Sequence, residues 1–192
     1  MSRSEDILGE LGEIDLQEKF KKRIREVKGT FLHYYVDEVE LADGHLSTRE
    51  LVIHPGAVTI IALTRKQEVL IVKQYRYPIQ RILYELPAGK LEQDEAPLVC
   101  AQRELKEETG YLARSWEKLA SFYTAPGFSS EYMHLYLAMD LLKVQQEPEP
   151  GEIITVEQIY LSKLEQMIKC GEIKDGKTVL GILWLLERMR SN

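Results

Sequence analysis

Residues 86–111 read LPAGKLEQDEAPLVCAQRELKEETGY, a polar loop that leads into a helical pattern. Pro97 suits the first helical turn, because its φ is already fixed near the helical value and its missing N–H has no partner there. Gly110 suits the left-handed residue that ends a helix. The stretch therefore predicts a helix from about Pro97 to Thr109.

Three carboxylates share one face of this predicted helix. Glu104, Glu107 and Glu108 are spaced i, i+3 and i+4, so their side chains are neighbours. Like charges at these spacings cost a few tenths of a kcal/mol per pair, and the negative end of the helix dipole adds to the penalty. A neighbouring face carries apolar residues that can pack on a core, namely Leu98, Ala101 and Leu105.

Two explanations of the acidic face follow from local sequence. In the first, it is a solvated surface that basic neighbours compensate. Arg103 reaches Glu107 four residues on, but we do not expect it to neutralise Glu104 and Glu108 as well, and Lys106 points away from them. In the second, the carboxylates bind a hard divalent cation, Mg²⁺ or Mn²⁺, which prefers oxygen ligands. The cluster alone leaves both explanations open.

The spacing around the cluster favours the metal. Gly89 is followed after five residues by Glu95 and after seven more by Arg103, and the chain then continues ELKEETGY. This resembles the Nudix box, G-x5-E-x7-R-E-U-x-E-E-x-G-U, where U is a bulky apolar residue. Tyr111 departs mildly from the usual aliphatic residue. The resemblance implies an α+β fold, the Nudix α/β/α sandwich with a mixed central sheet. It also implies a metal site made of Glu104, Glu107, Glu108 and the backbone carbonyl of Ala88.

The whole chain sets broader limits. At 192 residues it suits one domain with a small appended segment. A formal net charge of −6 without a long basic run argues against a nucleic-acid partner, and Lys19–Lys28, the one basic cluster, fits a helix end or a strand. No apolar run is long enough for a membrane span and no secretory signal is present, so we expect a cytoplasmic protein.

Strand patterns dominate the first half of the chain. After a short N-terminal helix, two strands are expected around the turn at Asp43-Gly44, a strong hairpin signal. VTIIAL and EVLIVKQYR, residues 58–63 and 68–76, are expected to form a second pair. Further strands are ILYEL, WEKLASFYTAP and EYMHLYLAMDLL, and helical spacing follows in SKLEQMIKCG and KTVLGILWLLERMR. We expect an N-terminal helix and hairpin region for dimerisation over residues 1–56 and the Nudix domain over residues 57–192.

Features outside the box resemble one subfamily. The segments STRELVIHPGAV, ELPAGK and YTAPGFSSE are similar to those of ADP-ribose pyrophosphatases. The resemblance implies metal-dependent hydrolysis of the pyrophosphate bond of ADP-ribose to AMP and ribose 5-phosphate. The alternatives are a broader hydrolase of ADP-sugars or other nucleoside diphosphate sugars, and a non-catalytic regulator that binds a nucleotide sugar. The intact box carboxylates argue against the regulator.

The same resemblance implies roles for residues outside the helix. The general base falls on Glu152, with Glu149 as the second choice, and Glu107 is expected to take part in catalysis. From the residues alone this acidic loop fits a solvated turn restricted by Pro148 and Pro150, and the resemblance favours a functional Glu152. The substrate-binding candidates are two arginines, two acidic residues and two tyrosines, one of which would stack on adenine: Arg49, Arg76, Glu85, Glu131, Tyr34 and Tyr35. For the arginines a sheet-edge ion pair is the alternative.

The predicted N-terminal hairpin points to self-association. It carries more apolar and aromatic side chains than one exposed sheet can hide, among them Phe31, Leu32, Val36 and Val39. The resemblance implies a homodimer in which a tyrosine of one subunit helps to enclose the adenine bound by the other.

Overall fold

The computed structural model describes residues 16–148 and 151–191, in two compact units, residues 1–53 and 54–192. The predicted N-terminal helix lies mostly in residues 1–15, outside the described residues, and so does Glu149. Within the described part of the chain, none of the helices has the length and apolar character needed to cross a membrane.

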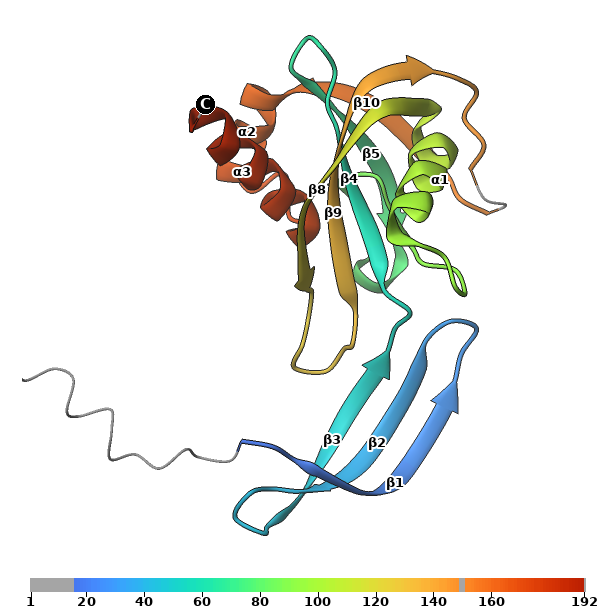
Figure 1. Cartoon of the computed structure of the whole chain (residues 1–192), viewed down its shortest axis with the longest axis vertical. Coiled ribbons are helices and arrows are strands. Elements are labelled where there is room, and N and C mark those ends of the chain that lie inside the picture. The colour runs from blue at the N-terminus through green and yellow to red at the C-terminus, as the bar shows by residue number, and fades with distance from the viewer. Residues whose placement is uncertain (1–15, 149–150, 192) are drawn as a thin grey trace, which may run out of the picture. The chain divides into compact units, whose positions relative to one another are not determined.

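The first unit contains an antiparallel sheet in the order β1-β2-β3 (Figure 1). The predicted turn at Asp43-Gly44 is confirmed, and Gly44 adopts the positive φ of 85° that a residue with a side chain would rarely accept. The basic stretch, which fitted either a helix end or a strand, forms a strand. The bounds of the three strands are Lys19–Lys28, His33–Glu40 and Leu46–Ile53 for β1, β2 and β3.

The second unit contains a mixed sheet and a smaller antiparallel sheet. The mixed sheet has the order β7-β4-β9-β8, in which β4 and β9 are parallel and the other pairs antiparallel. Its strands are Ala57–Ala62 (β4), Ala88–Lys90 (β7), Tyr111–Tyr123 (β8) and Tyr132–Lys143 (β9). The smaller sheet has the order β10-β5-β6, with strands Glu68–Arg76 (β5), Arg81–Glu85 (β6) and Ile154–Tyr160 (β10), and the short 3-10 helix η1, Tyr77–Ile79, joins β5 to β6.

The predicted pairing of the strands over residues 58–63 and 68–76 is wrong. An isolated bridge between Leu63 and Val69 joins their near ends, after which β4 and β5 enter different sheets. All six residues of β4 are buried. A strand covered on both faces belongs in the middle of a sheet with partners at both edges, and β4 has β7 and β9 in these positions.

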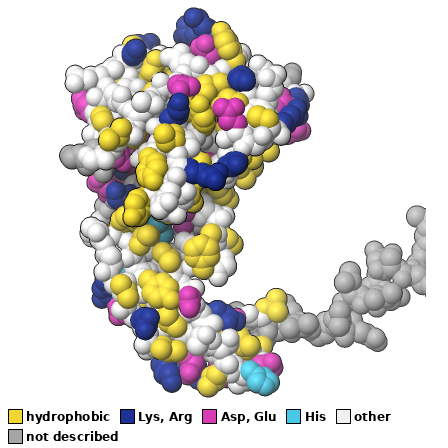
Figure 2. Space-filling view, turned by 180° about the vertical axis from the view of Figure 1, so that it is seen from behind, with side chains coloured by type: hydrophobic (Ala, Val, Ile, Leu, Met, Phe, Trp, Pro, Cys, Tyr) yellow, Lys and Arg dark blue, Asp and Glu magenta, His cyan; other side chains and the backbone are white. Residues whose placement is uncertain are grey.

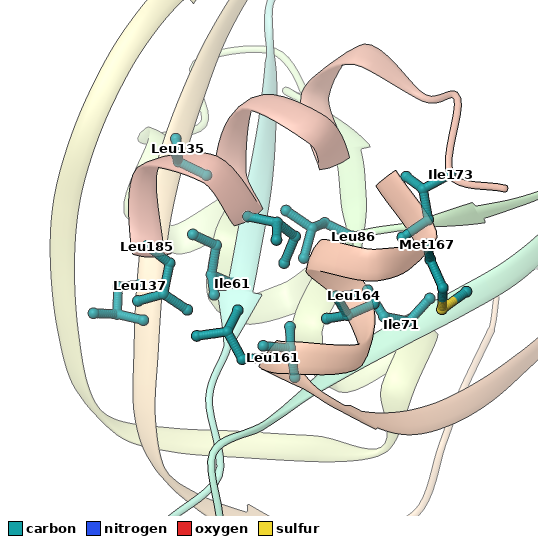
Figure 3. Packing of buried hydrophobic residues seen from close by; sticks show 12 residues of the cluster. Ile61, Ile71, Leu86, Leu135, Leu137, Leu161, Leu164, Met167, Ile173 and Leu185 are labelled. Atoms are coloured by element: carbon teal, nitrogen blue, oxygen red, sulfur yellow. The ribbon is translucent and has the colours of Figure 1, made fainter. Parts of the chain in front are cut away.

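Helices cover both faces of the mixed sheet, as the Nudix resemblance implied. α1 (Pro97–Thr109) lies on one side, and α2 (Leu161–Lys169) and α3 (Gly176–Arg190) lie on the other (Figure 1). Successive residues of β4 supply the two cores. Val58 and Ile60 pack with Leu105 of α1, whereas Ile61 packs with residues of α2 and α3 that include Leu164 (Figure 3).

α1 has the predicted bounds, and Gly110 ends it at φ 70° with its N–H donating to the carbonyl of Lys106. One detail of its predicted core face is wrong, because Leu98 is exposed. The buried face instead includes Glu104 and Glu108 beside Ala101 and Leu105. Two of the three carboxylates therefore point inward, where burial of charge requires compensation.

Candidate active site

The loop before α1 is fitted closely to the helix. Gly89 lies directly over the carboxylate of Glu104, and a Cβ at this position would overlap that carboxylate. The neighbouring Ala88 N–H donates a hydrogen bond of 2.9 Å to Oε2 of Glu108. β7, which contains both residues, pairs with the buried β4. The sheet thereby fixes the Ala88 backbone against both buried carboxylates.

Arg103 compensates more of the acidic face than its sequence position suggested. Its guanidinium donates to Glu95 at 2.9 and 3.0 Å, to Glu104 at 2.7 Å and to Glu107 at 3.0 Å. The expectation that it does not also compensate Glu104 is therefore wrong, because a guanidinium carries five N–H donors in a planar fork. The same expectation holds for Glu108, which receives no hydrogen bond or ion pair from Arg103. The hydrogen bonds from Arg103 hold the pKa of Glu95 at about 2.

Glu108 lacks such a partner. Its side chain is 3% exposed, and no Lys, Arg or His among the described residues lies within ion-pair distance of it. The pKa of Glu108 is raised to about 8, mainly by burial and in smaller part by the charges of Glu104 and Glu152. The hydrogen bond from the Ala88 N–H opposes this change. Burial also raises the pKa of Glu104, although Arg103 opposes this change.

Glu152 lies near these carboxylates although it is far from them in sequence. Its negative charge contributes to the raised pKa of both Glu104 and Glu108. It stands two residues before β10. The first candidate for the base therefore lies within electrostatic range of two carboxylates of α1.

The residues present fit a divalent cation by their chemistry. All the candidate ligands are hard oxygen donors, and the buried Glu108 carboxylate has the backbone N–H of Ala88 but no cationic partner among the described residues. In the conformation described, no three His, Cys, Asp or Glu side chains are grouped closely enough to hold a metal. Arg103 accounts for part of this, because it occupies carboxylate oxygens of Glu104 and Glu107 that a cation would use.

A pocket of about 480 Å³ opens beside the box loop. Its lining includes residues 88–90 of that loop, Arg76 of β5, Glu131 before β9, and Lys177 in the first turn of α3. Three of the predicted site residues, Ala88, Arg76 and Glu131, therefore line one pocket.

Arg76, a partly exposed residue of the pocket wall, forms an ion pair with the buried Glu85. Glu85 is 1% exposed and accepts two hydrogen bonds of 2.7 Å from the guanidinium of Arg76. Lys177 contacts the same carboxylate. Burial acts to raise the pKa of Glu85, but the contacts with both cations outweigh it and leave the pKa below its usual value.

Glu131 is held at another part of the pocket wall. Thr124 donates its hydroxyl to one carboxylate oxygen, and Nε2 of His54 lies 3.7 Å from the other. Nδ1 of His54 accepts a hydrogen bond of 3.0 Å from the Gly56 N–H. With Nδ1 used as an acceptor, the ring proton lies on Nε2, on the side of Glu131.

The other predicted substrate-binding residues, Arg49, Tyr34 and Tyr35, belong to the first unit and do not line this pocket. Arg49 forms an ion pair with Glu18, and the guanidinium of Arg23 stacks on the ring of Tyr35 at 3.4 Å from its centroid. Burial raises the pKa of Tyr34. The predicted contacts of Arg49, Tyr34 and Tyr35 with substrate stay predictions.

Lys177, Asp175, His54 and Thr124 were missed as site residues. The sequence DGKT at residues 175–178 is typical of a capped helix start, and Asp175 does accept from the Thr178 N–H at 3.0 Å. Nothing in that pattern indicates that Lys177, in the first turn of α3, contacts Glu85, 92 residues earlier. This contact arises from the packing of α3 on the sheet.

Comparisons with known proteins agree with this arrangement. The NUDIX domain family matches residues 53–179. An ADP-ribose pyrophosphatase of Bacillus subtilis (strain 168) is 40% identical over 172 residues, covering 88% of this chain and 93% of that protein. A methanol dehydrogenase activator of Bacillus methanolicus is 42% identical over 171 residues, covering 88% and 92%.

A solved structure described as an ADP compounds hydrolase has the same fold, with a TM-score of 0.79 at 19% identity over 92% of this chain and 96% of that one. The family match spans most of the second unit, including the box loop, α1 and the pocket residues. The chain therefore belongs to the Nudix family.

Proposed function

We propose that this chain hydrolyses the pyrophosphate bond of ADP-ribose to AMP and ribose 5-phosphate, with Mg²⁺ as the metal and Mn²⁺ as a substitute. The observation that carries the proposal is the pocket in which the Nudix box loop faces Arg76 and Glu131. The relative named as an ADP-ribose pyrophosphatase, 40% identical over most of both chains, supports this substrate.

Nudix hydrolases need a divalent metal. The ligands here would be the carboxylates of Glu104, Glu107 and Glu108 and the carbonyl of Ala88. When bound, the metal neutralises the phosphate oxygens that otherwise repel a nucleophile. The close approach of Gly89 to Glu104 supports this set, because it brings the Ala88 backbone to the carboxylates.

Glu152 is the proposed general base, which removes a proton from the attacking water. Its effect on the pKa of Glu104 and Glu108 supports this role, because a base must stand beside the reacting phosphate. Glu107 is more exposed than its two neighbours and is partly engaged by Arg103, so a movement of Arg103 would free it for catalysis or metal binding.

Recognition of the substrate is assigned to cations and hydrogen-bond acceptors. Arg76, fixed by Glu85, would bind phosphate oxygens, since a guanidinium pairs well with phosphate. Glu131 has an oxygen that can accept a ribose hydroxyl. Arg49 and one of the two tyrosines, Tyr34 or Tyr35, would bind the adenosine part.

A hydrolysis panel tests the proposal. ADP-ribose, ADP-glucose and GDP-mannose are compared at equal concentration with Mg²⁺, with Mn²⁺ and with EDTA, and the products are separated by chromatography. We expect ADP-ribose to have the highest kcat/KM and to give AMP. If all three react equally, the broader nucleoside diphosphate sugar hydrolase replaces the proposal. If none reacts with any metal, the enzymatic function itself is lost.

The relative named as a methanol dehydrogenase activator gives a second candidate of another class. In that case the chain would change the activity of a dehydrogenase. The Glu108→Gln variant separates the possibilities in a coupled dehydrogenase assay. Activation that persists in a variant without hydrolysis would indicate a regulator, and activation lost with hydrolysis would indicate that the chemistry itself is required.

We also propose that the chain is a homodimer through its first unit. This unit exposes apolar side chains between charged ones (Figure 2), among them Phe20, Ile24 and Val27 of β1 and Phe31 of the following turn, which are 47–61% exposed. Exposed apolar surface of this kind favours association. Light scattering at micromolar concentration tests this, and a fully active monomer would contradict it.

A further inference from the structure

Lys177 lies in the pocket wall, although its place at the start of α3 gave no indication of a site. It lines the pocket together with Arg76, Asp175 and Ala88. Its side chain is 12% exposed, and its ammonium contacts Glu85 and, at 3.0 Å, Asp175. Few lysines are this buried without a defined partner or task, because their charge is costly to desolvate.

The position of Lys177 is fixed from two sides. Asp175 caps α3 by accepting from the N–H and the hydroxyl of Thr178, at 3.0 and 2.6 Å. The Thr178 hydroxyl oxygen in turn accepts from the N–H of Leu86 at 2.8 Å. The first turn of α3 is thereby tied to the residue after Glu85, so Lys177 and Arg76 are held in one rigid frame.

Neutralisation of Glu85 does not by itself explain Lys177. Arg76 already donates to both oxygens of that carboxylate. An ammonium has three N–H donors, and the contacts of Lys177 among the described residues are with Glu85 and Asp175. One donor therefore remains for a group in the pocket that Lys177 lines.

Lys177 is also near the Nudix carboxylates. Its charge acts to lower the pKa of Glu108, and the charges of Glu108 and Asp175 act to raise the pKa of Arg76. Both cations line the pocket that residues 88–90 of the box loop also line. A pyrophosphate held at the box carboxylates would have its non-bridging oxygens within reach of this pair.

We propose that Lys177 is a substrate-binding residue that donates a hydrogen bond to a non-bridging oxygen of the pyrophosphate, and that Glu85 positions it together with Arg76. This assignment rests on the proposed function, since it takes a nucleoside diphosphate sugar as the ligand. It implies that Lys177 reads the part shared by all such substrates and contributes little to the choice of the distal sugar.

Three variants test the assignment. Lys177→Met keeps most of the side-chain length and removes the charge, Lys177→Arg restores a donor, and Lys174→Met is the control, because Lys174 is exposed three residues earlier. The Kd of α,β-methylene ADP-ribose, which resists hydrolysis, is measured by calorimetry in EDTA and again with Mg²⁺. Thermal unfolding checks that each variant is folded.

We expect Lys177→Met to raise this Kd about 10- to 100-fold, as for a lost hydrogen bond to a charged group. Lys177→Arg should recover part of the affinity, and Lys174→Met should match the wild type. In competition assays the loss should be similar for ADP-ribose, ADP-glucose and GDP-mannose. A purely structural lysine would lower the melting temperature without this uniform loss of affinity.

Two outcomes overturn the assignment. One is a folded Lys177→Met protein whose Kd stays within about twofold of the wild type, and the other is a loss confined to a single distal sugar. The proposed function fails separately. If the wild type binds the methylene analogue through Lys177 but hydrolyses no nucleotide sugar, Lys177 keeps its role and the hydrolase proposal falls. If the wild type hydrolyses nucleotide sugars and the Kd of Lys177→Met is unchanged, the hydrolase proposal stands and the role of Lys177 falls.

Discussion

Glu85 and Glu108 are equally buried carboxylates of one domain, at 1% and 3% exposure, but their surroundings differ. Glu85 is contacted by two cations, Arg76 and Lys177, and its pKa is lowered. Glu108 accepts a hydrogen bond from the Ala88 N–H, and burial raises its pKa to about 8. One site is electrostatically complete and the other is not.

The difference fits the proposal that Glu85 has a structural role and that Glu108 binds a metal. A buried ion pair is expensive to break, because removal of one partner leaves the other charge uncompensated. Burial of a carboxylate without a cation costs free energy, and binding of a cation removes that cost, so such a carboxylate favours cation binding. The surroundings of Glu85 should therefore matter for stability, and those of Glu108 for metal binding and activity.

The largest expected effect is on activity at Glu108. Under the proposed assignment, replacement by Gln removes a direct metal ligand, and since groups one step further from a metal already cost 10- to 100-fold, we expect kcat/KM to fall on the order of 1000-fold. Glu104→Gln should behave similarly. Glu92→Gln, an exposed change in the loop before α1, is the control.

The same variants should also differ from the wild type in their stability to urea. In EDTA, Glu108→Gln should unfold at the same or a slightly higher urea concentration than the wild type, because the neutral amide removes the free-energy cost of protonating this buried carboxyl group on folding. The stabilisation that Mg²⁺ adds should shrink. If these variants lost stability in EDTA in parallel with activity, the carboxylates of α1 would have a structural role instead.

Glu152 should give the next largest effect. If it is the general base, Glu152→Gln should lower kcat by about 100-fold or more while KM changes little. Glu147→Gln is the matched control, because Glu147 lies in the same acidic loop and pairs with Lys106. Unchanged kcat in Glu152→Gln would move the role to another carboxylate.

The effect at Glu85 should appear in stability. Glu85→Gln leaves Arg76 and Lys177 without their shared carboxylate, and we expect the free energy of unfolding in EDTA to fall by about 3 kcal/mol. Urea denaturation measures this difference. A loss no larger than that of Glu108→Gln would show that the two surroundings do not differ as described.

The two sites also differ in how far sequence predicts them. The spacing from Gly89 to Gly110 predicts α1 with its bounds and the carboxylates on it, because helix geometry relates residues three and four apart. It does not predict that Arg103 reaches Glu104, nor that β4 pairs with β9 rather than with β5. Lys177 meets Glu85 across 92 residues through the packing of α3, a contact that no local pattern encodes.

Per pH unit, the smallest expected effect is the pH dependence of stability without metal, where the two glutamates should act in opposite directions. The pKa of Glu108 is about 8 in the folded protein and near 4.5 when unfolded, so between these values the folded state holds a proton that the unfolded state has released. The stability from protonated Glu108 is present below pH 4.5 and is lost as pH rises toward 8, by at most about 1.4 kcal/mol per pH unit. The lowered pKa of Glu85 gives stability that is present above pH 4.5 and lost in acid.

Urea denaturation in EDTA at several values from pH 4 to 8.5 separates these contributions. Glu108→Gln should flatten the decline between pH 4.5 and 8, leaving a smaller slope from Glu104, whose pKa is also raised by burial. Glu85→Gln should keep that decline. Its loss of stability relative to the wild type should be smallest in acid, where the wild type has already lost the contribution of this carboxylate. With saturating Mg²⁺ the decline in the wild type should reverse, since a cation favours the ionised carboxylates. Identical slopes for the wild type and Glu108→Gln in EDTA would mean that Glu108 keeps its charge in the folded protein without a metal, and the contrast with Glu85 would then lie in contacts alone.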